Sequence, residues 1–206
     1  MLSVNGDMVH MRIGAALAAA MALGLAAGCS GSESPDSPPA SSSSPTMSPV
    51  PSVSVDPEVQ KALDAYDKFT RASNQAHEHP VAKGEVLPKS ADFERWSFDP
   101  LRIETLAFVH ALAAYRAQFR GEQPQSNVTV QQVNLGESPY PTVVLGDCVV
   151  PQGEYVPYST VTDKKLRLTQ GEDLEGPYLR TIEMIAVDGK WGARSVDVGD
   201  EGSCQP

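Results

Sequence analysis

The chain has 206 residues, with 16 Lys and Arg against 26 Asp and Glu, for a formal net charge of −10. The acidic residues are spread along the chain without a block of like charges, and a dispersed negative surface works against binding to nucleic acid or to anionic lipid. The composition therefore excludes a nucleic-acid-binding role, and the length allows one or two domains.

The first 28 residues are typical of a signal peptide. Arg12 precedes an apolar run over residues 13–27, which is 15 residues long. A membrane-spanning helix needs about 20 apolar residues, so this run has the length of a signal-peptide core rather than of an anchor. Met1, Met8 and Met11 are all possible starts, and the sequence does not choose between them.

A lone cysteine follows the apolar run. The small residues Ala26, Ala27 and Gly28 stand directly before Cys29, and this border resembles the lipobox of bacterial lipoproteins, with Ala26 where that family prefers Leu. The resemblance implies that Cys29 receives a diacylglyceryl thioether and further acylation, such as palmitate, and becomes the mature N-terminus. Two or more acyl chains anchor a protein stably. The alternative is an ordinary secretory signal with a chance cysteine at the cleavage site.

The segment after Cys29 has the composition of a spacer. Residues 30–55 contain 11 Ser and 6 Pro and almost no large apolar side chains. A segment that can bury so little apolar surface stays unfolded, and proline keeps it extended. The sequence therefore predicts a disordered tether over residues 29–55, followed by a single globular domain over residues 56–206.

The first helix of that domain is predicted from its start signals. Asp56 is a suitable N-cap, Pro57 suits the first helical position, and apolar residues then recur at helical spacing. The helix is expected to fray at residues 77–80. His77-Glu78-His79 is interpreted as a polar connector on a solvated loop rather than as a metal-ligand cluster.

A second helix is predicted to begin at Asp99-Pro100 and to run to about Arg120, with Gly121 as its C-cap. Its apolar residues form two stripes, which predicts packing on more than one side. The stripes are Ile103, Leu106, Ala107, His110, Ala113, Ala114 and Ala117 on one face, and Leu101, Phe108, Leu112, Tyr115 and Phe119 on another.

After Gln125 the apolar period changes from helical to two, which indicates strands. The predicted strands are Asn127–Leu135, Pro141–Val150, Tyr178–Val187 and Lys190–Val198, with a further short strand near Lys165–Thr169. Asp188-Gly189 is a dipeptide typical of a two-residue hairpin turn, and joins the last pair. Helices followed by strands predict an α+β fold in which the helices pack on a curved antiparallel sheet.

This pattern resembles the nuclear transport factor 2-like superfamily of cystatin-like cones. It is also similar to secreted lipoproteins of high-GC bacteria of uncharacterised function, on the pair Asp147-Cys148 at a strand end, Gly189-Lys190-Trp191 in a late hairpin, and Cys204 near the C-terminus. The resemblance implies helices on the concave face of a strongly curved sheet. Such folds host many functions, so it implies little about activity.

The three cysteines become an even pair once Cys29 carries lipid. Cys148 and Cys204 are then expected to form a disulfide in an oxidising compartment, and the alternative is two free thiols. A bridge closing this loop is worth roughly 4 kcal/mol in the loop-entropy model. The chain has no CxxC or Cys/His spacing typical of a metal site, and no metal or cofactor is predicted.

His110 and Asp147 are the candidate catalytic residues. His110 is the ionisable residue of its helix stripe, and Asp147 shares a strand face with apolar residues, where burial would raise its pKa. Enzymes of the ketosteroid-isomerase and dehydratase branches of the resembled superfamily use an acid or a histidine inside the cone, so a converging pair would be a general acid/base candidate. The alternative is structural, with His110 bonded to a backbone carbonyl and Asp147 capping a strand end.

The function expected from these observations is non-enzymatic. The chain is predicted to be lipid-anchored on the extracytoplasmic face of the cell membrane and to display a domain that binds a small ligand or a protein partner at the mouth of the cone. The alternative is a small isomerase, dehydratase or lyase using His110 and an inward carboxylate. A cavity lined by His110 and Asp147 would favour the enzyme, whereas a filled cone would favour the binding module.

Overall fold

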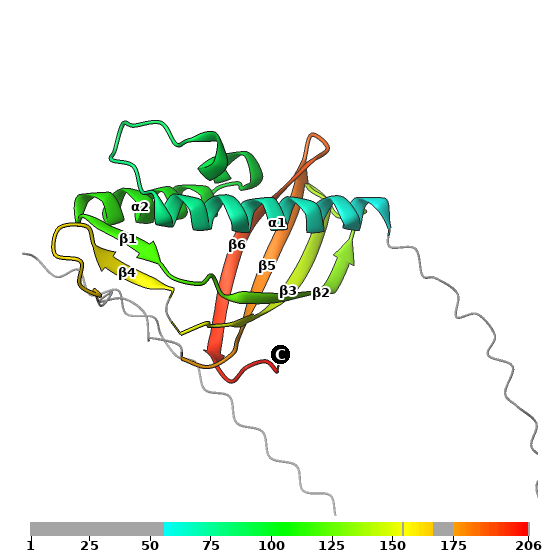
Figure 1. Ribbon diagram of the computed structural model, residues 1–206. Helices are drawn as coiled ribbons and strands as arrows, with labels where there is room; N and C mark the ends of the chain where they lie inside the picture. The colour runs from blue at the N-terminus through cyan, green and yellow to red at the C-terminus, as the bar shows by residue number, and fades with distance from the viewer. Residues whose placement is uncertain (1–55, 154, 167–174, 206) are drawn as a thin grey trace, which may run out of the picture. The chain divides into compact units, whose positions relative to one another are not determined.

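The computed structural model describes residues 56–153, 155–166 and 175–205. The predictions for the signal peptide, for Cys29 and for the Ser/Pro-rich tether lie outside these residues. Within them the elements follow the predicted α+β order, helices first and strands afterwards. Figure 1 shows the long first helix lying across the strands of an antiparallel sheet.

Helix α1 (Pro57–Glu78) begins as its sequence predicts. The Asp56 side chain accepts a hydrogen bond of 2.8 Å from the backbone N–H of Glu58, and Pro57 occupies the first turn. Its buried residues are mostly small, so the helix axis can approach the sheet closely. They are Val59, Ala62, Ala65, Tyr66, Phe69, Ala72, Ser73 and Ala76.

The main sheet has four antiparallel strands in the order β2-β3-β5-β6. They are β2 (Gln125–Asn134), β3 (Thr142–Val150), β5 (Tyr178–Val187) and β6 (Lys190–Glu201). All four predicted strands are therefore confirmed. Asp188 and Gly189 both have positive φ, of 51° and 73°, which is the geometry of the predicted hairpin turn between β5 and β6.

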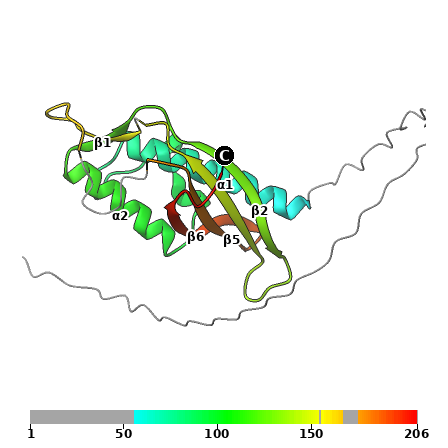
Figure 2. The same ribbon diagram turned by 90° about the horizontal axis from the view of Figure 1, so that it is seen from below.

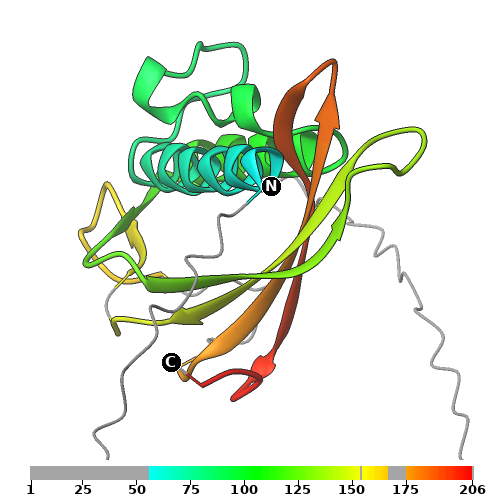
Figure 3. The same ribbon diagram turned by 90° about the vertical axis from the view of Figure 1, so that its right-hand side faces the viewer.

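The sheet curves around α1, as the view along the helix shows (Figure 3). Residues on the side of the sheet that faces α1 alternate along each strand and form the core with the helix. The fully buried strand residues of this core include Val143, Leu145, Ile182, Met184 and Ala193. The predicted fold class, with helices packed on a curved antiparallel sheet, is confirmed.

Helix α2 (Leu101–Ala114) differs from its prediction at both ends. It stops well short of Arg120, because Arg116 adopts a positive φ of 51° and the next residues form strand β1 (Ala117–Arg120). At its start Asp99 does not cap the helix and instead accepts two hydrogen bonds of 3.0 Å from Arg102.

The second helix is shortened by pairing with a distant segment. Strand β1 pairs antiparallel with β4 (Val156–Ser159), and the backbone N–H of Thr160 donates to the carbonyl of Arg116 at 2.7 Å. A tertiary contact of this kind overrides local helix propensity. The short strand expected near Lys165 is thus replaced by β4, with Lys165 itself in an isolated bridge to Tyr158. Residues 167–169 of that prediction lie outside the described residues.

Helix α2 buries one side only, so the prediction of packing on more than one side was wrong. Its buried residues are Leu101, Val109 and Leu112, and Val109 belonged to neither predicted stripe. Ile103 is 61% exposed and Tyr115, just past the helix end, is 80% exposed. The helix packs beside α1 at one side of the domain (Figure 2), and its apolar residues Ile103, Ala107 and Ala114 are exposed.

Candidate functional site

Asp147 lies in the middle of the domain, on the face of β3 that is turned toward α1. Its residue exposure is 0%. The strand register places Val128 of β2 on one side and Arg180 of β5 on the other. A carboxylate with no contact to water must find its hydrogen-bond partners within the protein.

Three side chains supply those partners. Tyr66 of α1 donates its hydroxyl to Oδ2 of Asp147 at 2.6 Å, Ser126 of β2 donates to Oδ1, and Arg180 of β5 donates to Oδ2 and forms an ion pair. The contacts join three strands and the first helix at a single carboxylate. We call these four residues the Asp147 cluster.

The cluster keeps Asp147 ionised. Burial raises the pKa of the Asp147 carboxyl, as expected from the apolar residues around it, but the charge of Arg180 and the hydrogen bonds from Ser126, Tyr66 and Arg180 outweigh burial. The net pKa is held below its ordinary value. The expectation of a raised pKa was therefore wrong, because a cationic neighbour on the next strand was not foreseen. Burial also raises the pKa of the Tyr66 hydroxyl, so it stays a donor.

His110 does not belong to the Asp147 cluster. It is half-buried on α2, and the hydrogen bonds of Asp147 among the described residues go to the three partners named above. Two pockets, of about 340 and 60 Å³, lie elsewhere, and neither is lined by His110 or Asp147. Buried apolar residues of α1, α2 and β3 pack together in one core cluster. His110 and Asp147 therefore do not form the hydrogen-bonded pair that the enzyme alternative required.

His77 has a role that the sequence did not reveal. The predicted end of α1 within residues 77–80 is confirmed, because the helix ends at Glu78 and His79 is exposed. The prediction of a solvated connector was wrong for His77, whose ring packs in an aromatic cluster with Phe108 and Phe119, at centroid distances of 5.1 and 5.6 Å. Although the residue is partly exposed, its Nε2 is buried and has no hydrogen-bond partner among the described residues. Burial lowers the pKa of His77 to about 4.

The predicted disulfide is present. Cys148 of β3 and Cys204 of the C-terminal tail are bonded, with their Cα atoms 5.8 Å apart. Cys148 follows Asp147 directly, so the two side chains leave opposite faces of the strand. The strand thus holds α1 on one face through Asp147 and the chain's tail on the other through Cys148.

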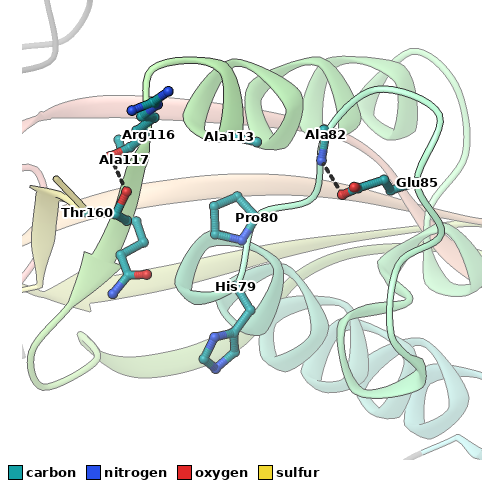
Figure 4. A pocket seen from close by; sticks show the side chains of 9 residues that line it. His79, Pro80, Ala82, Glu85, Ala113, Arg116, Ala117 and Thr160 are labelled. Carbon is teal, nitrogen blue, oxygen red and sulfur yellow. Dashed lines mark hydrogen bonds between the residues drawn. The ribbon is translucent and has the colours of Figure 1, made fainter.

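The larger pocket is an open hollow of about 340 Å³ near the end of α1 (Figure 4). Its polar groups are already engaged or divergent. The Glu85 carboxylate accepts from the backbone N–H of Ala82, the Thr160 hydroxyl donates to the carbonyl of Arg116, and the side chains of Arg116 and His79 point away from each other. A catalytic or tight small-ligand site needs convergent polar groups, and this hollow lacks them.

Sequence reasoning found Asp147 but missed its partners. A signal for Arg180 was present, because strand alternation places it on the same face as Ile182 and Met184, both fully buried. A lone arginine on a buried face requires an acid, and Asp147 is the acid on the neighbouring strand. Tyr66 and Ser126 carried no comparable signal, because their contacts depend on how α1 and β2 are placed.

Within residues 56–153, 155–166 and 175–205, no helix has both the length and the apolar character required to span a membrane. The same part of the chain contains no group of three or more His, Cys, Asp or Glu side chains arranged to hold a metal ion.

Comparison with known proteins finds no family model and no curated protein that match the chain. One solved structure, described as the intermembrane space region of chloroplast protein ARC6, is similar to this chain at 10% sequence identity and a TM-score of 0.39. The alignment covers 68% of this chain and 94% of the ARC6 chain. A TM-score this low carries no argument about the fold or the function of this chain.

Proposed function

We propose that this protein is a lipid-anchored extracytoplasmic module, fixed to the cell membrane through Cys29, whose domain binds a partner on its surface. The observation that carries the proposal is that two of the three cysteines are bonded to each other, which leaves Cys29 as the third. Cys148 and Cys204 are bonded to each other, which suits an oxidising compartment, and Cys29 is the remaining cysteine, directly after the small residues of a lipobox-like border.

A binding module fits the interior better than an enzyme does. Asp147 has no solvent exposure and its carboxylate is shared by three donors, so it is not placed to exchange a proton with a substrate. A long helix in the hollow of a curved four-stranded sheet supports membership of the cystatin-like cones, in the variant whose interior is filled by protein. In such a domain the outer surfaces are left for partners.

Mass spectrometry and fractionation of the full-length protein from a bacterial host test the anchor. The N-terminal peptide should begin at Cys29 and carry acyl mass, and the protein should leave the membrane only with detergent. Cys29→Ala should abolish both properties, whereas Ser30→Ala, one residue away, should retain them. A wild-type protein that starts elsewhere, or that is found unacylated in the soluble fraction, would contradict the proposal.

A further inference from the structure

Strand β2 is a free edge of the main sheet among the described residues. It is the first strand in the order β2-β3-β5-β6, and no other strand of the described residues pairs with its outer side. In Figure 2 it forms the outer border of the sheet. A free edge presents a row of unpaired N–H and C=O groups, and proteins usually block it with charged residues, proline or a covering segment.

The two edges of this sheet differ in how they are protected. Strand β6, at the other edge, carries five charged residues in twelve, and the backbone N–H of Phe98 covers part of it by donating to the carbonyl of Ala193 at 2.7 Å. Strand β2 reads QSNVTVQQVN, with no charged residue and no proline in ten positions. All of its residues except Val128 and Asn134 are exposed.

One irregularity limits the usable length of this edge. The register between β2 and β3 shifts between Val130 and Gln132, so a bulge interrupts the strand at Gln131. Bulges are a common way to end pairing at an edge. The regular part that a partner could extend is therefore Gln125–Val130, and we call it the β2 edge.

Apolar side chains along this strand also lack full cover. Val130 and Val133 lie opposite the buried Leu145 and Val143, so they are on the core side of the sheet, yet they are 40% and 43% exposed. At these two residues the core side of the sheet is only partly covered by the rest of the domain. An additional strand beside β2 would cover Val130 on the core side.

We propose that the β2 edge pairs antiparallel with the β2 edge of a second copy of this chain, forming a continuous sheet across a two-fold axis. The strand complements itself. A two-fold axis perpendicular to the sheet keeps both core faces on one side, so Val128 and Val130 meet their like and the polar Asn127 and Thr129 meet on the other face.

The lack of charge on this strand permits a second copy as the occupant. Each copy has a net charge of −10, which opposes association, but β2 has no charged residue, so two β2 edges can pair without placing like charges opposite each other. The proposal does not depend on lipidation at Cys29, since the pairing surface belongs entirely to the folded domain.

A charge-swap experiment on the full-length chain tests this pairing. Two copies with different tags are co-expressed and one tag is purified. Wild-type copies should co-purify. The double variant Asn127→Lys with Thr129→Lys places Lys opposite Lys for an axis at Asn127, Val128 or Thr129, and co-purification with its own kind should fall about tenfold, because like charges directly opposite destabilise strand pairs. The corresponding double Glu variant should behave alike.

Mixing the Lys variant with the Glu variant should restore co-purification to within about twofold of the wild type. As a control, double Lys and double Glu substitutions at Ile103 and Ala107, which are exposed on α2, should leave co-purification at the wild-type level. Each variant should retain the Cys148–Cys204 bond as evidence of folding. Repeating the set on the Cys29→Ala background separates this result from the anchor.

Three results would overturn the proposal. Wild-type copies that do not co-purify would show that two copies of this chain do not pair. Lys variants that co-purify as well as the wild type would place the contact elsewhere on the chain. Folded Lys and Glu variants that fail to rescue each other would show that the β2 edge does not pair with the β2 edge of a second copy.

Discussion

At the scale of single residues, two buried ionisable groups differ in their hydrogen bonding. The Asp147 carboxylate receives three donors, one of them cationic, whereas the buried Nε2 of His77 has no partner among the described residues. Removing one partner of a buried ion pair destabilises the fold strongly, because it leaves the other charge buried and unpaired. A buried polar atom without a partner already destabilises the fold, so replacing it by an apolar group of similar shape can leave stability unchanged.

Asp147→Asn should destabilise the domain by about 3 kcal/mol, because it leaves the guanidinium of Arg180 largely buried without a counter-charge. Tyr66→Phe should cost less, about 1 to 2 kcal/mol, since Asp147 keeps its other donors. Urea unfolding at neutral pH measures both. The double variant Asp147→Leu with Arg180→Met should be more stable than Asp147→Asn, because no unpaired charge remains. Equal losses in all three variants would contradict an ionic role for the cluster.

Because of His77, the free energy of unfolding should decrease as the pH is lowered from 6.5 to 4. Its pKa is lowered by burial from 6.5 to about 4 in the folded state, so in this window the unfolded chain binds a proton that the folded chain does not. The His77 contribution is therefore complete above pH 6.5 and declines as the pH drops, by at most about 3 kcal/mol.

His77→Phe should remove this part of the pH dependence and leave stability at pH 7 equal or higher, because no unpaired nitrogen is buried. Chemical unfolding at several pH values between 4 and 7 measures the slope. His79→Phe, at an exposed position two residues further on, is the matched control and should keep the wild-type slope. An unchanged slope in His77→Phe would show that the ring protonates without cost.

At the scale of elements, the junction between α2 and β1 depends on one residue. Arg116 adopts a φ of +51°, which is unfavourable for a residue with a side chain, and its own side chain is exposed. Arg116→Gly should stabilise the domain by about 0.5 to 1 kcal/mol by relieving this conformation. Arg116→Ala should change little, and thermal unfolding of both variants separates the backbone effect from loss of the charge. A less stable glycine variant would contradict this account.

The sequence predicted those elements whose signals are local. The start of α1 depends on Asp56 and Pro57 alone, and the last hairpin depends on Asp188-Gly189, so both could be recognised without a structure. The end of α2 could not, because nothing between Ala113 and Arg120 breaks a helix. Strand β1 exists because it pairs with a segment about 40 residues away.

The candidate site was predictable to a similar degree. The disulfide followed from counting cysteines, and the burial of Asp147 followed from the apolar residues on its strand face. The partner proposed for Asp147 was a histidine on α2, whereas the real partners come from α1, β2 and β5. Which helix lies in the hollow of the sheet is set by packing between distant segments, and residue spacing in one helix does not contain that information.

At the scale of the whole domain, the Cys148–Cys204 bond should supply a large share of stability. It connects residues 56 positions apart, and cross-linking a loop of this length stabilises a domain by roughly 4 kcal/mol in the chain-entropy model. Cys148→Ser combined with Cys204→Ser should lose 2 to 5 kcal/mol (roughly, by the usual range for such bonds) in denaturant unfolding. A reducing agent added to the wild type should give the same loss and serves as the control. A loss below about 1 kcal/mol would contradict this role.

The same bond turns the second half of the domain into a covalent ring that contains β4, β5 and β6. A protease that cuts the backbone once inside the ring produces two termini but no separate fragment, and the pieces part only after reduction. A cut in residues 30–55, before α1, acts differently, because it detaches the complete ring and the helices from everything N-terminal to them. A single cut between Cys148 and Cys204 therefore leaves the domain in one piece, whereas a single cut in residues 30–55 releases the domain from whatever the N-terminal residues are attached to.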